Sequence, residues 1–245
     1  MSSREQAQDA WVVIPAAGAG RRLGSAIPKQ YLSVAGKALL AHTLAVFDRI
    51  ERVRGIVVVI SAQDEYWPQL GWQGHKPVYT VTGGKERCHS VDNALRSLRQ
   101  SARDDDWVLV HDAARPCLTR QDVDNMFTVL DGHAVGGLLA APVTDTLKQA
   151  DAQGECVATI ERADKWRALT PQMFRYAVLQ DALRQAIEQG ALVTDDAEAV
   201  ERAGHRVRLV PGRADNIKVT SQEDLLLAEC FLHARAASAT DERLT

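Results

Sequence analysis

The chain is poor in cysteine and has no long apolar run, and both shortages exclude whole classes of protein. Its four cysteines, Cys88, Cys117, Cys156 and Cys230, show no paired C-x-x-C spacing and no companion histidine pattern for zinc. We therefore expect reduced thiols that hold no metal. No stretch approaches the roughly 18 uninterrupted apolar residues of a membrane span, and residues 1–10 contain no apolar signal core. We expect a cytoplasmic protein with no membrane partner.

Basic charge is not in excess either. The chain has 29 Lys and Arg residues against 32 Asp and Glu residues, which gives a formal net charge of −3. A dedicated nucleic-acid binder normally carries a basic excess, so we expect no nucleic-acid partner. Cations that gather in one part of such a chain indicate a local site, and small acidic substrates fit that site better.

The stretch from Trp11 to Leu32 contains such a gathering. Residues 11–16 are almost all apolar and too few for a helix, which predicts a strand buried on both faces. A glycine-rich turn follows, and Arg21, Arg22 and Lys29 lie close to it in the sequence. At the carboxyl end of a parallel strand, glycines let main-chain N–H groups approach a phosphate. The stretch therefore predicts a polyphosphate site; the alternative is a tight turn whose arginines lie in solvent.

Two familiar glycine motifs are absent from this turn. In a Walker A loop four residues separate the glycines and a lysine follows, whereas five residues separate Gly18 from Gly24 and Ser25 follows directly. The dinucleotide motif also fails, because three residues separate Gly20 from Gly24 and no strand-ending acid follows about 20 residues later. The sequence thus excludes a P-loop and disfavours a nicotinamide cofactor.

Short apolar runs that alternate with amphipathic segments predict the fold. We expect an α/β, Rossmann-like domain in which a mostly parallel twisted sheet is flanked by helices. One domain is expected over residues 11–232, with a flexible N-terminus at 1–10 and a flexible C-terminal tail at 233–245. Strands are predicted at residues 11–16, 55–61, 78–82, 107–111, 136–143 and 207–210, and helices at 36–50, 91–98, 121–130, 175–189 and 195–203. A last helix is predicted after a capping box formed by Thr220 and Glu223.

The segment at about 141–166 predicts an extended arm. Residues 144–148 and 156–161 alternate polar with apolar side chains and flank a turn at 151–154, as in a β-hairpin. Because a two-stranded arm is marginally stable alone, we expect it to pack against a second copy in a homodimer. The alternative is an arm that folds back on its own domain.

Two further segments contain candidate ligand-binding residues. Gly83 and Gly84 open a second glycine turn before a helix, where the main chain and Ser90 could hydrogen-bond a nucleobase; the alternative is an ordinary helix cap. Asp112 follows a buried strand and could orient a substrate hydroxyl or hold Mg²⁺, the alternative being a turn residue. We interpret His111 as a satisfied strand residue rather than a catalytic base.

These pieces occur in an order that resembles a known family. The motifs are V-I-P-A-A-G-x-G-x-R at 13–22, P-K-Q at 28–30, G-G-x-x-R-x-x-S-V at 83–91, H-D-A-A-R-P at 111–116, T-P-Q at 170–172 and N-I-K-V-T at 216–220. Over about residues 11–230 the chain resembles the 2-C-methyl-D-erythritol 4-phosphate cytidylyltransferases of the non-mevalonate isoprenoid pathway. A ribitol 5-phosphate cytidylyltransferase shares much of the pattern, and a non-catalytic nucleotide-binding protein is the third alternative.

The resemblance implies an enzyme that transfers CMP from CTP to methylerythritol phosphate, with Mg²⁺, in a homodimer whose arms complete the sites. The implied catalytic residues are Arg22, Lys29, Arg162 and Lys218. Nucleotide contacts are implied for Pro15, Ala16, Ala17, Gly18, Gly20, Gly83, Gly84, Arg87, Ser90 and Ala113. Substrate contacts are implied for Asp112, Arg115, Thr146, Arg162, Thr170 and Lys218. Asp112 is the candidate metal ligand, with phosphates and water as the alternative ligands.

Overall fold

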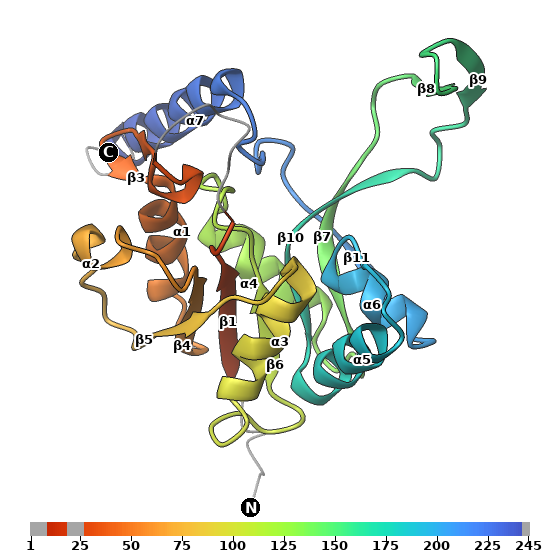
Figure 1. Ribbon diagram of the computed structural model, residues 1–245. Coiled ribbons are helices and arrows are strands. Elements are labelled where there is room, and N and C mark those ends of the chain that lie inside the picture. The colour runs from red at the N-terminus through yellow and green to blue at the C-terminus, as the bar shows by residue number, and fades with distance from the viewer. Residues whose placement is uncertain (1–8, 19–26, 242–245) are drawn as a thin grey trace, which may run out of the picture.

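The computed structural model describes residues 9–18 and 27–241, and a seven-stranded sheet lies at its centre (Figure 1). The strand order is β11-β7-β10-β6-β1-β4-β5, and every neighbouring pair is parallel except the two that involve β10. The predicted α/β fold with a mostly parallel sheet is therefore confirmed. The strands are β1 (Ala10–Pro15), β4 (Val53–Ile60), β5 (Val78–Thr82), β6 (Trp107–Val110), β7 (Gly136–Pro142), β10 (Trp166–Arg175) and β11 (Arg208–Pro211).

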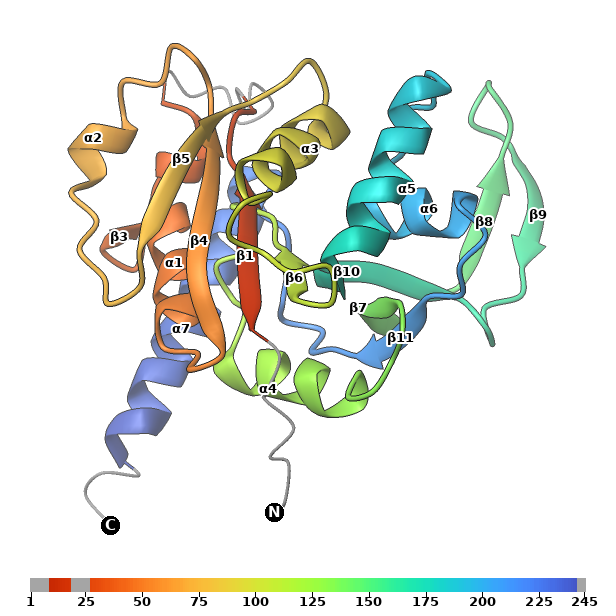
Figure 2. The same cartoon turned by 90° about the horizontal axis from the view of Figure 1, so that it is seen from below.

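Helices cover both faces of this sheet (Figure 2). Because successive side chains of a strand point to opposite faces, β1 contributes to two cores. Val12 and Ile14 pack with α1 and α4, whereas Trp11 and Val13 pack with α3 and α5. The helices are α1 (Leu39–Asp48), α2 (Trp67–Leu70), α3 (Arg87–Ser97), α4 (Arg120–Val129), α5 (Tyr176–Glu188), α6 (Asp196–Arg202) and α7 (Gln222–Asp241). The short 3-10 helix η2 spans Lys29–Tyr31, and β2 (Ser33–Val34) pairs with β3 (Lys37–Ala38).

The long strand β10 is the strand of the central sheet that the sequence did not predict. It runs antiparallel between β6 and β7, and its half from Leu169 onward is buried. Pro171 argues against a central strand because proline cannot donate to a ladder. The pairing with β7 is irregular between Ala168 and Gln172, and the proline lies in that interruption. The segment predicted only to return the chain to the body is thus a central strand.

The predicted arm is a separate hairpin that projects from the body (Figure 1). Its strands β8 (Leu147–Ala150) and β9 (Cys156–Ile160) pair only with each other in the described chain. The Asp151 carboxylate accepts hydrogen bonds from the N–H groups of Gln153 and Glu155, which closes the connecting turn. The hairpin does not fold back on its own domain; its expected contact with a second copy stays a prediction.

The C-terminal segment differs from its prediction in two ways. Helix α7 continues past Leu232 to Asp241 where a flexible tail was expected, and Arg235 donates to the carbonyl of Cys117. The helix cap lies one residue later than predicted. Asp224 accepts hydrogen bonds from the N–H groups of Thr220 and Ser221, and its own N–H donates to the Ser221 hydroxyl, so Ser221 and Asp224 form the capping box. In the described segments, no helix has the length and apolarity to cross a bilayer.

Candidate functional site

A cavity of about 350 Å³ lies where β1 and β6 end. It is bounded by the first glycine loop, the turn before α3 and the loop that precedes α7. Predicted site residues that line it are Pro15, Ala16, Ala17, Gly18, Lys29, Gly84, Arg87, Ser90, Asp112, Ala113 and Lys218. Gly20 and Arg22 lie outside the described residues. The structure therefore brings most of the predicted residues together at one edge of the sheet.

The two glycine turns pack against each other beside this cavity. A Cβ atom added to Gly83 would collide with Ala17 of the first loop, and one added to Gly84 would collide with His89. The Gly84 N–H donates to the Ser90 hydroxyl over 3.1 Å, and that hydroxyl donates to the Glu86 carbonyl over 3.1 Å. Ser90 thus fixes the shape of the turn.

Anchored neighbours hold Lys29 at the cavity. The Gln30 amide donates to the Ala16 carbonyl over 2.6 Å, which ties η2 to the end of β1. Tyr31 stacks on Tyr66 and donates its hydroxyl to Asp64 over 2.9 Å. Burial and the Asp64 carboxylate raise the pKa of Tyr31, so the hydroxyl stays protonated as a donor. The sequence presents Gln30 only as part of the P-K-Q motif, and no pattern in it marks Tyr31.

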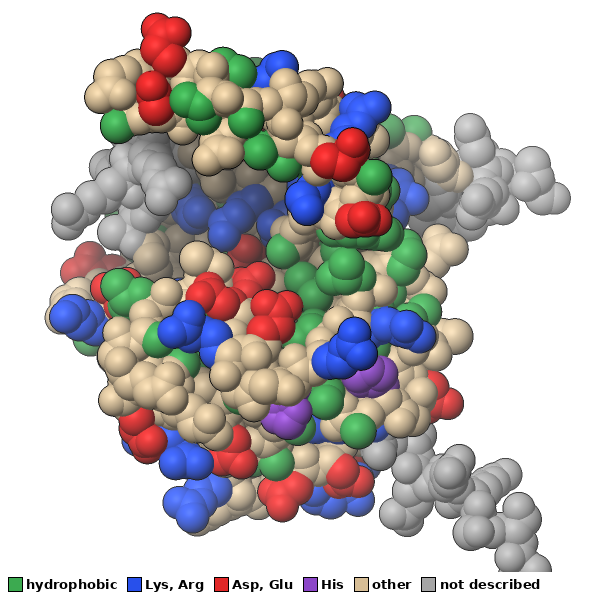
Figure 3. Space-filling view, turned by 90° about the vertical axis from the view of Figure 1, so that its right-hand side faces the viewer, with side chains coloured by type: hydrophobic (Ala, Val, Ile, Leu, Met, Phe, Trp, Pro, Cys, Tyr) green, Lys and Arg blue, Asp and Glu red, His purple; other side chains and the backbone are tan. Residues whose placement is uncertain are grey.

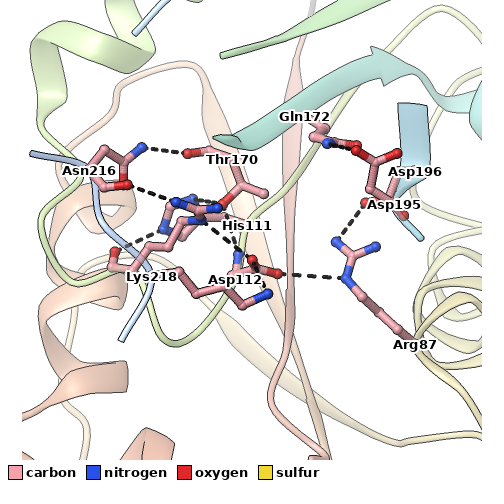
Figure 4. Close-up of polar contacts among 10 residues, drawn as sticks. Arg87, His111, Asp112, Thr170, Gln172, Asp195, Asp196, Asn216 and Lys218 are labelled. Atoms are coloured by element: carbon pink, nitrogen blue, oxygen red, sulfur yellow. Dashed lines mark hydrogen bonds and ion pairs between the residues drawn. The ribbon is translucent and has the colours of Figure 1, made fainter. Parts of the chain in front are cut away.

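Asp112 lies among three cations that come from different elements (Figure 4). Its Oδ2 is 2.9 Å from Nζ of Lys218 and 3.5 Å from Nε of Arg115, and its Oδ1 is 3.6 Å from Nε of Arg87. Burial alone would raise the pKa of Asp112, but Arg87, Lys218 and Arg115 outweigh it and lower that pKa strongly. The carboxylate is therefore charged at every physiological pH.

Arg87 also binds a carboxylate that the sequence did not single out. Its Nη2 is 2.7 Å from Oδ2 of Asp196, the first residue of α6, whose side chain is fully buried. Burial lowers the pKa of Arg87, but Asp196 and Asp112 outweigh it and raise the pKa. The α6 start is itself anchored on β10, because Gln172 donates to Asp195 and accepts from the Ala197 N–H. Arg87 thus connects Asp112 to α6.

A buried hydrogen-bonded layer lies directly behind Asp112. His111 contacts the Arg115 carbonyl through Nε2 at 3.1 Å and the Thr170 hydroxyl through Nδ1 at 3.0 Å. A carbonyl only accepts, so we assign the proton to Nε2, and Nδ1 accepts from Thr170. The Thr170 oxygen in turn accepts from the Asp112 N–H, and Asn216 donates to the Thr170 carbonyl. Desolvation by burial lowers the pKa of His111 to about 4, as suits a structural residue.

Arg115 and Thr170 therefore lie behind the cavity, within this layer. Arg115 donates through Nη1 to the Asn216 carbonyl over 2.8 Å, which joins the loop after β6 to the loop before α7. Both side chains are buried. Asn216, which the sequence presented only as part of a motif, is the link between the two loops.

The surroundings of Asp112 also decide whether these residues could hold a metal ion. Lys218, Arg115 and Arg87 surround the Asp112 carboxylate at 2.9–3.6 Å, and their positive charges would repel a divalent cation. Within the described ranges, no cluster of three or more His, Cys, Asp or Glu side chains could hold a metal. The described side chains thus do not fit a protein-held metal centre.

The arm residues are remote from this cavity within one chain. Thr146 and Arg162 are exposed and lie on the projecting arm, where Arg162 donates to the Thr144 carbonyl. The surface is hollowed below the arm, and basic side chains gather inside that hollow (Figure 3). One chain alone therefore does not bring Thr146 and Arg162 to the other predicted residues.

Comparisons with known proteins identify a family to which this chain is similar. Residues 10–234 match the sequence model of the 2-C-methyl-D-erythritol 4-phosphate cytidylyltransferase family. The enzyme of that name from Pseudomonas entomophila is 50% identical over 216 residues, which cover 88% of this chain and 92% of the relative. The one from Hahella chejuensis is 46% identical over 225 residues, covering 91% and 92%.

Solved structures show the same fold. A crystal structure of a 4-diphosphocytidyl-2C-methyl-D-erythritol synthase superposes with a TM-score of 0.80 at 35% identity, covering 92% of this chain and 99% of the other. The Francisella tularensis 2-C-methyl-D-erythritol 4-phosphate cytidylyltransferase gives a TM-score of 0.79 at 34% identity, covering 91% and 99%.

Proposed function

Because the chain belongs to the 2-C-methyl-D-erythritol 4-phosphate cytidylyltransferase family, we propose that its cavity is the place where CMP is transferred. The reaction joins CTP and 2-C-methyl-D-erythritol 4-phosphate into 4-diphosphocytidyl-2-C-methyl-D-erythritol and releases pyrophosphate. The observation that carries the proposal is the meeting of both glycine turns, Lys29, Asp112 and Lys218 on one cavity.

The nucleotide half of the site is the edge formed by the two glycine turns. Main-chain N–H groups near Gly18 and Gly84 can approach the nucleotide closely because no Cβ intervenes. Lys29, fixed by its anchored neighbours, would stabilise the negative charge that builds up on the α-phosphate and on the departing pyrophosphate. Arg22, outside the described residues, is proposed to act with it.

The acceptor half lies around Lys218 and Asp112. The substrate phosphate is already an anion at neutral pH, so its oxygen can attack the α-phosphorus without a general base. Lys218 would steer that phosphate, and Asp112, which is ionised, would accept a hydrogen bond from a substrate hydroxyl. We propose direct attack without a covalent enzyme intermediate.

Magnesium is proposed to arrive with the triphosphate of CTP. Phosphate oxygens and water supply the hard oxygen ligands that Mg²⁺ prefers, and the described side chains offer no cage of their own. When bound, it would screen the repulsion between the two anionic substrates.

Pyrophosphate release tests the activity. The full chain with Mg²⁺ is assayed with each nucleoside triphosphate, paired with methylerythritol phosphate or with ribitol 5-phosphate. Release is expected with CTP and methylerythritol phosphate. Release with ribitol 5-phosphate alone would change the substrate assignment, and no release under any pairing would favour a nucleotide-binding role.

The arm supports a composite site in a homodimer. Thr146 and Arg162 are exposed on a hairpin with no packing partner in the described chain, and the family resemblance gives both a substrate role. We therefore propose that the arm of one subunit reaches the cavity of the other.

Subunit mixing tests this proposal. Lys29→Ala and Arg162→Ala proteins are each expected to be nearly inactive, because each loses one cation from both sites. If Arg162 acts in the partner's site, a mixed dimer contains one site with both residues intact, and about a quarter of wild-type activity returns when exchange is random. Absence of recovery, with exchange shown by tagged subunits, would place both residues in one subunit.

A further inference from the structure

The two oxygens of Asp112 are in unequal environments. Lys218 and Arg115 make their closest contacts to Oδ2, at 2.9 and 3.5 Å. Oδ1 meets Arg87, whose Nε is 3.6 Å away, which is beyond hydrogen-bond distance. Oδ1 therefore keeps acceptor capacity beside the cavity that Asp112 and Arg87 both line.

Arg87 would ordinarily be expected to move within hydrogen-bond distance of Oδ1 of Asp112. A guanidinium and a carboxylate attract each other strongly in a buried site, and short charge-assisted contacts are their favoured geometry. What opposes this approach is Asp196, which holds Nη2 of the same guanidinium at 2.7 Å on the side of α6 (Figure 4).

Burial and the hydrogen bonds of its neighbours fix the position of Asp196. The side chain is fully buried at the start of α6, and Gln172 fixes that start through the flanking Asp195 and Ala197. Its Oδ1 is buried without a hydrogen-bond partner in the described part of the chain. Burial raises the pKa of Asp196 and the Arg87 guanidinium opposes that rise, so the 2.7 Å contact with Arg87 is the main compensation for burying the charge of Asp196. Breaking that contact would leave the charge of Asp196 buried without a partner, so the guanidinium of Arg87 stays beside Asp196.

We propose that Asp196 is a positioning residue, which restrains the Arg87 guanidinium and thereby keeps Oδ1 of Asp112 open to a hydroxyl of the acceptor substrate. The inference rests on the proposed function, in which the acceptor is a polyol phosphate. It assigns the hydroxyl contact to Oδ1, and it gives a role in acceptor binding to a residue with no contact to the cavity.

A double-mutant cycle tests the inference. Asp196→Asn keeps the shape of the side chain but removes the charge, so Arg87 is expected to move onto Oδ1 of Asp112. The KM for methylerythritol phosphate, measured at saturating CTP, should rise on the order of tenfold, as for one lost hydrogen bond to a charged group. In an Arg87→Gln background there is no guanidinium to move, and the same replacement should change that KM less than about twofold.

The controls separate positioning from loss of structure. Arg87→Gln with Asp196→Asn replaces a buried ion pair by two neutral amides, so neither position is left with an unpaired buried charge. Asp122→Asn is the matched control, because Asp122 is another buried carboxylate at a helix start, bonded to Thr119 and remote from the cavity. It should lower the free energy of unfolding without raising the KM. An equal rise in KM in both backgrounds, or a similar rise in Asp122→Asn, would refute the inference.

Crystal structures of wild type and Asp196→Asn test the expected movement of Arg87 without depending on enzyme activity. In the variant, a guanidinium nitrogen of Arg87 should lie within hydrogen-bond distance of Asp112 Oδ1, and an unchanged separation would overturn the inference. A wild-type chain that released no pyrophosphate would refute the proposed function instead, and this structural comparison would still decide the role of Asp196.

Discussion

His111 makes the stability of this protein depend on pH in a defined window. Burial lowers its pKa from the ordinary 6.5 to about 4, and both ring nitrogens have partners that suit the neutral form. Between these two values the unfolded chain binds a proton at this position and the folded chain does not. Stability therefore rises with pH across the window and is lost as the pH falls from about 6.5 towards 4.

The size of the effect follows from the shift. The whole difference between the pKa of His111 in the unfolded and in the folded chain corresponds to about 3 kcal/mol of unfolding free energy, at about 1.4 kcal/mol for each pKa unit. Between pH 7 and pH 5, where the unfolded chain takes up most of its proton and the folded chain very little, the loss is about 2 kcal/mol. For a protein of ordinary stability this is a substantial part of the total free energy of unfolding.

His111→Gln isolates this contribution. The glutamine amide can still donate to the Arg115 carbonyl but does not titrate, so the variant should lose about 2 kcal/mol less than wild type between pH 7 and pH 5. The lost Thr170 contact should make it less stable by about 1 kcal/mol at pH 8, where His111 is neutral in both states. Urea unfolding at each pH measures both quantities, and all other titrating groups cancel in the difference. Parallel stability curves for the two proteins would refute the argument.

Two more substitutions probe the nucleotide half of the cavity. Lys29→Ala should lower kcat by about 10²–10³, as for loss of one preorganised donor to the transition state, while thermal unfolding stays close to wild type; near-normal pyrophosphate release would remove Lys29 from the mechanism. Gly84→Ala places a methyl group against His89 and should displace the turn that Ser90 fixes. Its KM for CTP should rise about tenfold or more with little change in that for methylerythritol phosphate, and an equal rise in both would indicate general loosening of the fold.

The parts of the site that the sequence predicted are those that depend on local pattern. Apolar runs such as 11–16 and 107–111 identify buried parallel strands, and the carboxyl ends of such strands meet at one edge of the sheet. The first glycine loop and Asp112 could therefore be placed together from the sequence alone. The turn before α3 could be added because a helix begins directly after it.

The parts that could not be predicted depend on contacts between distant segments. Strand β10 contains Pro171, which locally opposes a strand, yet pairing with β6 and β7 on both sides outweighs that preference. Asp196 is 109 residues from Arg87, and nothing in the short polar run that contains it distinguishes it from an ordinary helix start. The proposed contact of the arm with a second subunit would also join distant segments, because the residues that the arm meets would belong to another chain.

The cations around Asp112 divide into two kinds, which sharpens the roles proposed for them. Arg87 and Arg115 are largely buried and direct their donors to Asp196, Asp112 and the Asn216 carbonyl, so their planar groups hold the protein together. Lys218 contacts the same Asp112, yet its side chain is 43% exposed. An ammonium group has three N–H donors, and after one has bonded to Asp112 the others can reach a phosphate. The arginines therefore orient Asp112, and Lys218 is the cation of this group that can meet the incoming substrate without giving up its partner.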